Sequence, residues 1–486
     1  MEPCDLSYIA GQCDSILGDV PSRREKRDIL LALLLLAWLS VSPAGGPSEG
    51  EGAGERAAQG PYSRGPRPSL GRMWEDCLSS EEQTVGHSLA SLASSAAGRI
   101  PDLRPLLPAD SVWERIPGRQ LKQLLPLLDH ALRGEGEARG AAALWEAIVA
   151  RYPGETSPGT GRFYAPAEVV GLLTALLRPE GGTVYDPCCG SGNMLLRFAA
   201  PLPGRGADVQ LYGREADEDA WRMAKFQLLF RGVSADLGPA PSYAPAEDGA
   251  ERLKADYVIS NPPFNDRSWQ DDYETLQHRP FLRYGAPPRN RSSLAWLQFM
   301  LQALKPGGKL AVLLNVSPLD SSFASEKRIR EGLVRDGLLT AVMLLPAGLF
   351  WGTEVPVALL VLQNGGKSRL CGDRILMVDG SGLGTRDGKK LRLTRQDRQA
   401  ILAVWDAYQR GESPEQTGFC ATVSPADVEA REGTLYPRTY IPYEKAPLPG
   451  WEALLERESA LLAELQGQLR DSEALVRRIC RGGQEE

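Results

Sequence analysis

The sequence is poor in the residues that bind metals or build disulfide frameworks. Its 486 residues include three histidines and eight scattered cysteines, and no two cysteines form a CxxC pair. Structural zinc sites commonly depend on such pairs together with histidine, and a chain of this length seldom relies on disulfides. We therefore expect no metal site, and free thiols in a reducing cytoplasm.

The sequence also lacks an apolar run long enough to cross a membrane. Residues 29–41, ILLALLLLAWLSV, form the one strongly apolar run, whereas a membrane-spanning helix needs about 20 such residues. The run follows the charged segment RREKRD and lies too far from Met1 for an ordinary secretory signal. It is interpreted as a buried helix, with a membrane anchor as the less favoured alternative.

An excess of positive charge is absent as well. The formal net charge is -7, which argues against a surface that binds nucleic acid along its whole length. No helix-turn-helix signature, zinc finger or long basic arm is recognisable. Any contact with DNA must therefore be local, and any choice of DNA sequence should come from a partner.

The composition divides the chain into four parts. Residues 1–150 have apolar residues at helical spacing, interrupted at 43–70 by a segment so rich in Gly, Pro, Ser and Glu that it predicts a flexible linker or insertion. Residues 151–370 alternate between strand and helix patterns. Residues 371–445 form a mixed extension with a weaker pattern, and residues 446–486 are predicted to form a long helix.

The alternation within residues 151–370 predicts an α/β fold. Short apolar runs bounded by turn residues alternate with helical stretches, which indicates a mostly parallel sheet with helices on both faces. The predicted strands are GTVYDP, VQLYGREA, ADYVIS, GKLAVLLN, LLTAVMLLP and PVALLVLQN.

The final helix has an apolar stripe. Four residues recur every seven positions, and two more lie on the intervening seam, as in a coiled coil. These residues are Leu455, Leu462, Leu469, Val476, Leu465 and Ile479. Such a stripe is expected in a helix that binds a partner and also in a helix that packs on its own chain, and both alternatives stay open.

The segment VYDPCCGSGNML joins a predicted strand to a helix through a glycine-rich turn. Glycines at such a turn let backbone amides approach a ligand at the carboxyl end of a parallel strand. The next strand ends in Glu215, 25 residues after Gly190, where such folds hold ribose hydroxyls with a carboxylate. A full GxGxxG fingerprint is not met because Leu195 stands at its last position, which favours S-adenosylmethionine over NAD.

The segment VISNPPFND ends another strand about 70 residues later. The amine of adenine is a poor nucleophile because its lone pair is delocalised into the ring. The side-chain oxygen of Asn261 and the carbonyl of Pro262 could accept both amine hydrogens, and Phe264 could offer a face to a flat base. A Pro-rich turn that only closes a strand is the alternative, and the distance from the glycine loop favours the functional interpretation.

These motifs together resemble the amino-group DNA methyltransferases, and most closely the modification (methyltransferase) subunit of type I restriction-modification systems. The resemblance runs from about residue 160 to 365, with GRFYAPAEVVGLL, DPCCGSGNML, YGREAD, ADYVISNPPFN, RYGAPP, AWLQFMLQALKPGGKLAVLLN and LPAGLFWGTEVPVALLVL in order. It implies a Rossmann-like class I methyltransferase sheet, preceded by a helical N-terminal domain. It also implies S-adenosylmethionine as methyl donor and N6 of a flipped adenine in double-stranded DNA as acceptor.

The resemblance assigns roles residue by residue. The cofactor would be held by a segment before the first strand, by the glycine loop and by the ribose-binding acid: Phe163, Tyr164, Ala165, Pro166, Asp186, Pro187, Gly190, Ser191, Gly192, Asn193 and Glu215. The adenine would be held by Asn261, Pro262, Pro263 and Phe264. The C-terminal helix would pack on a separate specificity subunit, with two methyltransferase subunits for each specificity subunit. A nuclease subunit could join this assembly.

The sequence departs from the family pattern in the cofactor half. Ala165 stands where a threonine is usual, and Cys188 and Cys189 replace smaller or hydroxylated residues. The acid expected after the third strand is missing. The contact that this acid would make with the adenine of the cofactor must come from Asp236, Glu247 or Asp248, or from none of them.

Four arginines follow the Asn-Pro-Pro-Phe segment and are interleaved with aromatic residues: Arg279, Arg283, Arg289 and Arg291. They could contact phosphates beside a flipped base or belong to a solvated loop. Three alternatives to a type I subunit stay open, namely a solitary adenine methyltransferase, a protein glutamine methyltransferase and a cofactor-binding scaffold without activity. Glutamine methyltransferases usually carry Tyr where Phe264 stands and lack the long C-terminal helix.

Overall fold

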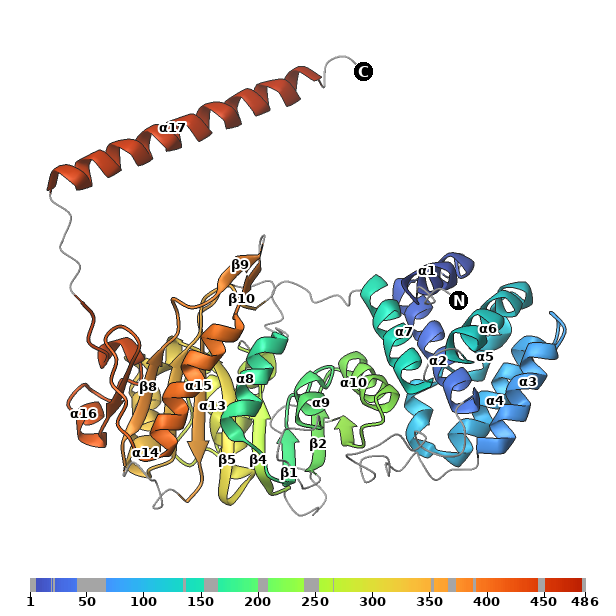
Figure 1. Cartoon of the computed structure of the whole chain (residues 1–486), viewed down its shortest axis with the longest axis horizontal. Coiled ribbons are helices and arrows are strands. Elements are labelled where there is room, and N and C mark those ends of the chain that lie inside the picture. The colour runs from blue at the N-terminus through green and yellow to red at the C-terminus, as the bar shows by residue number, and fades with distance from the viewer. Residues whose placement is uncertain are drawn as a thin grey trace. The chain divides into compact units, whose positions relative to one another are not determined.

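The computed structural model describes most of the chain (Figure 1). The described residues are 6–18, 20, 22–41, 67–133, 137–152, 165–199, 209–239, 253–264, 266–350, 354–365, 373–387, 390–444 and 451–482. The chain divides into two compact units, residues 1–441 and 442–486. The predicted boundaries near 150 and 370 lie inside the first unit and stay predictions.

A sheet forms the centre of the first unit. In the described part of the chain it has nine strands in the order β11-β8-β6-β7-β5-β4-β1-β2-β3. The strands are β1 (Gly182–Asp186), β2 (Val209–Glu215), β3 (Asp236–Pro239), β4 (Ala255–Ser260), β5 (Leu304–Asn315), β6 (Leu339–Leu344), β7 (Val357–Gln363), β8 (Ile375–Asp379) and β11 (Cys420–Val423). All the predicted strands are confirmed.

The sheet is mixed, with parallel pairs in the majority. The pairs β3-β2, β2-β1, β1-β4, β4-β5 and β6-β8 are parallel. Strand β7 runs antiparallel between β5 and β6, and β11 runs antiparallel to β8. The strand order reverses direction at β1, which makes the carboxyl ends of β1 and β4 the switch point where ligands bind in such folds.

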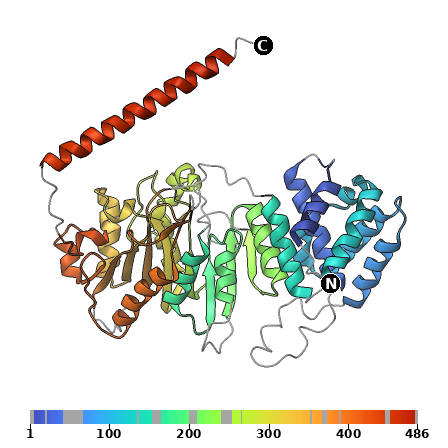
Figure 2. The same cartoon turned by 45° about the horizontal axis from the view of Figure 1, so that its top comes forward.

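Two hydrophobic cores cover the two faces of the sheet, because successive side chains of a strand point to opposite faces. On β7, Leu359 packs into one core and Leu360 into the other. One face is covered by α8 (Ala167–Leu177), α9 (Asn193–Ala199), α10 (Glu218–Phe230) and α15 (Arg395–Gln409). The other is covered by α13 (Ser293–Gln302), α14 (Ala324–Arg335) and α16 (Pro425–Glu429), as Figures 1 and 2 show. The expected sheet with helices on both faces is confirmed.

The region after residue 370 is part of the same sheet. It supplies β8 and β11, which extend the sheet beyond β6. The same region also contains the hairpin strands β9 (Thr385–Asp387) and β10 (Lys390–Arg392), and η3 (Pro437–Thr439). Three short elements earlier in the chain complete the unit, namely α11 (Arg267–Asp271), α12 (Tyr273–Leu276) and η2 (Ser317–Leu319). The weak sequence pattern of this region therefore conceals strands that pair over long distances.

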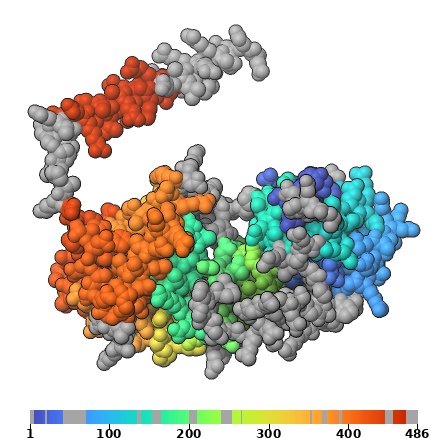
Figure 3. Space-filling model, viewed as in Figure 1, coloured from blue at the N-terminus to red at the C-terminus, as the bar shows by residue number. Residues whose placement is uncertain are grey.

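The N-terminal region is helical and packs against one end of the sheet. Its elements are α1 (Leu6–Ile16), α2 (Arg23–Val41), α3 (Arg67–Ser79), α4 (Val85–Arg99), η1 (Pro101–Leu106), α5 (Asp110–Arg115), α6 (Gly118–Arg133) and α7 (Glu137–Arg151). Figure 3 shows these helices, in blue to cyan, beside the light-green segment that contains α10. Buried Arg27 donates to Asp219 on α10 at 3.0 Å, and Asp28 accepts from Arg222 at 2.7 Å.

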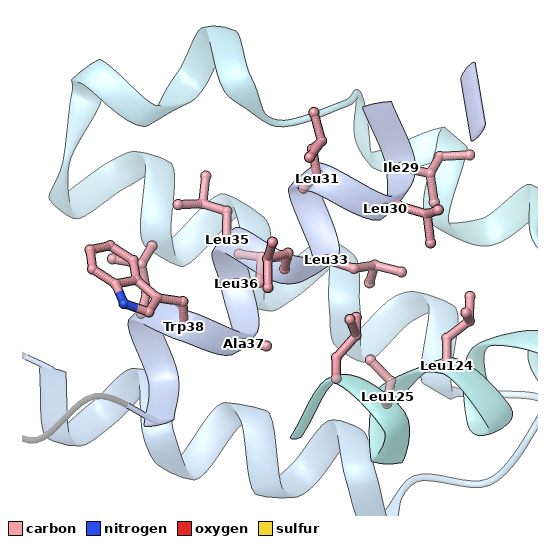
Figure 4. Close-up of a cluster of buried hydrophobic side chains, with 14 of the residues drawn as sticks. Ile29, Leu30, Leu31, Leu33, Leu35, Leu36, Ala37, Trp38, Leu124 and Leu125 are labelled. Carbon is pink, nitrogen blue, oxygen red and sulfur yellow. The ribbon is translucent and has the colours of Figure 1, made fainter. Parts of the chain in front are cut away.

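The apolar run of the sequence is the centre of these helices. Every residue of α2 from Ile29 to Leu39 is buried. Figure 4 shows Leu33 on the side of α6, whereas Leu31 and Leu35 point to other sides of α2. A helix that is apolar on all sides must be enclosed on all sides. The interpretation as a buried helix is confirmed, and none of the helices within the described ranges is long and apolar enough to span a membrane.

The second unit contains one long helix, α17 (Trp451–Gly482). The predicted helix is therefore confirmed. The apolar stripe is exposed where it is described, with Leu455, Leu462, Leu465 and Leu469 between 42% and 59% exposed. Binding of a partner through this stripe stays a prediction.

Candidate active site

The two motifs of the sequence meet at the switch point of the sheet. Strands β1 and β4 are parallel neighbours, with Val184 opposite Tyr257 and Tyr185 opposite Val258. Their carboxyl ends are Asp186, which opens the glycine loop, and Ser260, which precedes Asn261. Segments about 70 residues apart in the sequence therefore lie side by side.

A buried carboxyl group joins the two segments. Asp186 is 1% exposed, and its Oδ1 accepts hydrogen bonds from the Ser260 hydroxyl at 2.9 Å and from the Cys188 backbone N–H at 3.0 Å. Burial raises the pKa of Asp186 to about 7, although both hydrogen bonds lower it. The Ser260 hydroxyl thus ties the end of β4, just before the Asn-Pro-Pro-Phe segment, to the start of the glycine loop.

The glycine loop is held against the end of β2. The Gly190 N–H donates to Glu215 Oε2 at 3.0 Å, and the Asp217 N–H donates to Glu215 Oε1 at 2.8 Å. Gly190 and Gly192 have φ of 55° and 85°, which favour glycine. A Cβ at Gly192 would lie 3.2 Å from the Cβ of Ala224 on α10. The structure therefore brings together the loop and the carboxylate that the sequence assigned to one ligand.

The two loop cysteines serve as neutral packing groups. Cys189 is 6% exposed, and its sulfur would lie 3.0 Å from a Cβ at Gly213 of β2. Burial raises the pKa of Cys188 and Cys189 well above the ordinary thiol value, so both stay protonated. Glycine at position 213 leaves the room that Cys189 fills.

Asp236, one of the residues considered for the missing acid, lies at the start of the third strand. It begins β3, opposite Tyr212, and forms an ion pair with Arg214 at 3.1 Å. The residue level with Glu215 is Pro239, about 10 Å further along the strand. This position at the opposite end of the strand does not favour Asp236, and the choice among Asp236, Glu247, Asp248 and none of them stays a prediction.

Some assigned cofactor residues lie outside the described part of the chain. These are Phe163, Tyr164, Glu247 and Asp248. Ala165 packs against the core and Pro166 caps the start of α8. Asn193 begins α9, and its Oδ1 accepts from Gln227 at 2.7 Å.

The Asn-Pro-Pro-Phe segment follows β4 directly. Asn261 is half-buried and Pro262 is buried. Phe264 is 5% exposed and packs edge-on against Phe350, with ring centroids 6.4 Å apart. Little of the Phe264 ring is therefore exposed, and its stacking on a base stays a prediction.

Several of the four arginines already have partners within the chain. Arg283 forms an ion pair with Asp336 at 2.6 Å, and Arg291 forms one with Glu326 at 3.0 Å. Arg289 donates to the Gln270 carbonyl at 2.9 Å, while Arg279 is half-buried on the same connection. Their contact with DNA stays a prediction.

Sequence reasoning missed residues whose roles depend on neighbours in space. Ser260 and Phe350 are the clearest cases. The position of Ser260, directly before Asn261 at a strand end, is a usable signal. No local pattern indicates that Phe350 contacts Phe264. Within the described ranges no group of three or more His, Cys, Asp or Glu side chains could hold a metal ion.

Comparison with curated proteins finds several methylase subunits. The type I restriction enzyme HindI methylase subunit of Haemophilus influenzae is 28% identical over 341 residues, which is 67% of this chain and 76% of that protein. The MjaIX methylase subunit of Methanocaldococcus jannaschii is 27% identical over 294 residues, 58% of this chain and 52% of that protein. The match thus spans about half the length of the latter relative.

Solved structures share the fold. The methyltransferase subunit of a type I restriction-modification system from Streptococcus thermophilus superposes with a TM-score of 0.63 at 17% identity, covering 90% of this chain and 99% of that one. A modification subunit of a putative type I restriction enzyme from Vibrio vulnificus gives 0.58 at 15% identity, covering 87% and 92%. The family model described as N-6 DNA Methylase matches residues 141–446. Because this match covers more than half of the chain, the chain belongs to the N-6 DNA methylase family.

Proposed function

We propose that the chain transfers a methyl group from S-adenosylmethionine to N6 of adenine in DNA, as the modification subunit of a type I restriction-modification system. The observation that carries the proposal is the hydrogen-bonded junction between Asp186 and Ser260. It holds a glycine loop and an Asn-Pro-Pro-Phe segment side by side. The family membership and the names of the curated relatives support the same activity.

The cofactor half fits a ligand with a ribose. The loop from Gly190 to Gly192 can bring backbone amides close to it, and Glu215 lies against the same loop. Ala165 and Pro166 would border the site from the start of α8. When bound, S-adenosylmethionine supplies a methyl group on a positively charged sulfur. Within the described residues no acid stands at the end of β3.

The substrate half supplies neutral acceptors. The Asn261 Oδ1 and the Pro262 carbonyl would accept both hydrogens of the adenine amine, which turns its lone pair out of conjugation with the ring. Two successive prolines restrict the backbone so that both acceptors can face one nitrogen. The methylated amine sheds its proton afterwards, so no ionised base is needed beside it.

The proposed partners are double-stranded DNA and a specificity subunit. The net charge of -7 and the lack of a recognisable base-reading motif leave the choice of DNA sequence to another chain. The exposed leucine stripe on α17 would pack on that chain. We propose that two methyltransferase subunits bind one specificity subunit, and that a nuclease subunit can join this assembly.

Asn261→Ala tests the substrate half without touching the cofactor loop. In the complex with the specificity subunit, we expect the variant to lose transfer of labelled methyl to DNA while its affinity for S-adenosylmethionine, measured by calorimetry, is unchanged. Transfer at the wild-type rate would refute the role of Asn261. Site-specific transfer by the chain alone would instead indicate a solitary adenine methyltransferase.

A further inference from the structure

An exposed aromatic side chain lies at the catalytic edge of the sheet. Phe323 is 50% exposed and caps the start of α14, shortly after the carboxyl end of β5. Strand β5 is the parallel neighbour of β4, which carries Asn261 at its end. Single exposed apolar residues are common on protein surfaces, so exposure alone indicates nothing. The way in which the chain holds Phe323 is what sets it apart.

A buried arginine braces the segment that leads to Phe323. Arg330 is 2% exposed and donates to the carbonyls of Pro318, Ser321 and Gly433 at 2.8 to 2.9 Å. A buried guanidinium is tolerated only when its donors are satisfied. Two of the three carbonyls, those of Pro318 and Ser321, belong to the segment between β5 and α14, and the third, that of Gly433, follows α16. One buried side chain thus ties this segment to another part of the chain, although the last residue of the segment presents an apolar ring to solvent.

A second arginine supports the ring itself. The guanidinium of Arg291 lies 5.3 Å from the centroid of the Phe323 ring. It is held there by the carboxylate of Glu326, which has no exposed surface, and by the hydroxyl of Ser317. From the sequence, Arg291 was expected either to contact a phosphate or to belong to a solvated loop. In the structure its guanidinium packs against the aromatic ring of Phe323.

The supported ring is connected to the Asn-Pro-Pro-Phe segment. The Asp266 N–H, five residues after Asn261, donates to the hydroxyl of Ser292 at 3.4 Å. Ser292 follows Arg291 directly in the chain. Next to it, the hydroxyl of Ser293 is hydrogen-bonded to Asn315 at the end of β5 at 3.3 Å. The exposed ring and the catalytic segment therefore lie on one connected edge.

We propose that Phe323 stacks on the DNA bases that remain in the duplex when the target adenine is flipped out. The inference rests on the proposed function. Removing a base from the stack costs a few kcal/mol, and apolar side chains inserted at base steps offset this cost. A ring whose backbone segment is already hydrogen-bonded in place, and which a neighbouring guanidinium contacts, loses less conformational freedom when it inserts. Phe264, which is largely buried, then borders the flipped base, and Phe323 fills the space left behind.

The test compares two duplexes with the assembled complex of the chain and its specificity subunit. One duplex pairs the target adenine with thymine, and the other places an abasic residue opposite the target, so that the base is already unpaired. We expect Phe323→Ala to slow single-turnover methyl transfer roughly 10- to 100-fold on the paired duplex. On the abasic duplex the loss should shrink to within about 3-fold, since an unpaired base costs less to flip and the flipped state needs less stabilisation.

Two further variants make the result specific. Phe323→Trp keeps an aromatic face and should retain most of the activity, whereas Tyr8→Ala removes a 63% exposed aromatic from α1 and should have no effect. Wild-type activity of Phe323→Ala on the paired duplex, or an equal loss on both duplexes, would overturn the inference. If the wild-type complex methylated no DNA at all, the proposed function would fail first and the inference with it.

Discussion

Replacing Ser260 by alanine removes one hydrogen bond at the point where the cofactor loop meets the catalytic segment. Ser260 has no exposed surface, and its hydroxyl donates to Asp186 at 2.9 Å. A hydrogen bond to an ionised acceptor contributes roughly 1.5 to 3 kcal/mol, and losing it leaves a buried oxygen with one partner fewer. We expect Ser260→Ala to lower the free energy of unfolding by about 2 kcal/mol at pH 8.

The size of this loss should depend on pH. The folded-state pKa of Asp186, about 7, lies above its unfolded value, because burial disfavours the ionised form. The unfolded chain therefore ionises first, and folding stability falls as pH rises from about 4 to about 7, by on the order of 4 kcal/mol. The Ser260 bond lowers this pKa, so its removal raises the pKa further. The variant then loses more stability than the wild type above pH 7, and little below pH 5.

Urea unfolding at pH 5 and pH 8, followed by tryptophan fluorescence, measures both effects. Thr174→Val is the matched control, because Thr174 is 1% exposed and its hydroxyl donates to the carbonyl of Val170 at 2.9 Å, a partner that does not titrate. We expect a loss of about 1 kcal/mol for the control, the same at both pH values. A Ser260→Ala loss that is equal at pH 5 and pH 8 would refute the proposed role of the Asp186 carboxylate.

Three further variants test other parts of the structure. Gly213→Ala should lower the free energy of unfolding by roughly 1 to 3 kcal/mol and weaken binding of S-adenosylmethionine, because its Cβ would lie 2.6 Å from a Leu237 methyl and 3.0 Å from the Cys189 sulfur. Thermal melting measures the stability and calorimetry measures the binding. Unchanged values would contradict the packing argument. Arg27→Met should lower the free energy of unfolding by roughly 2 to 4 kcal/mol, since it leaves the acidic groups on α2 and α10 without their buried partner. In the same urea unfolding assay, Arg24→Met at the exposed neighbour should lower it by under about 1 kcal/mol. Leu462→Glu should leave the melting temperature unchanged, because this side chain is 54% exposed, but should abolish co-purification with the specificity subunit; retained co-purification would argue that α17 is not the contact.

Local patterns were sufficient for the strands and the loop. Runs such as ADYVIS and PVALLVLQN combine β-branched and apolar residues between turn residues, and a strand buried on both faces needs that composition. The glycines at 190 and 192 take left-handed backbone conformations that few other residues adopt easily. These constraints act within a few residues, so the chain reveals them without tertiary information.

Short strands at the ends of the sheet were beyond such reasoning. Strand β3 spans Asp236–Pro239 and β11 spans Cys420–Val423, and neither is long enough to show an alternation. Each is a strand because a neighbour from elsewhere in the chain supplies its hydrogen bonds. The same dependence decides that Pro239, and not Asp236, lies level with Glu215.

By itself, the sequence determined which segments form strands, where the glycine turn lies and which residues form the Asn-Pro-Pro-Phe corner. Only the tertiary structure decided their partners. The Asp186–Ser260 bond joins residues 74 positions apart, and the Arg291–Glu326 pair places the Arg291 guanidinium beside the ring of Phe323. Local conformation depends on neighbours along the chain, whereas hydrogen bonds, burial and ion pairs depend on neighbours in space, and these exist only once the sheet has assembled.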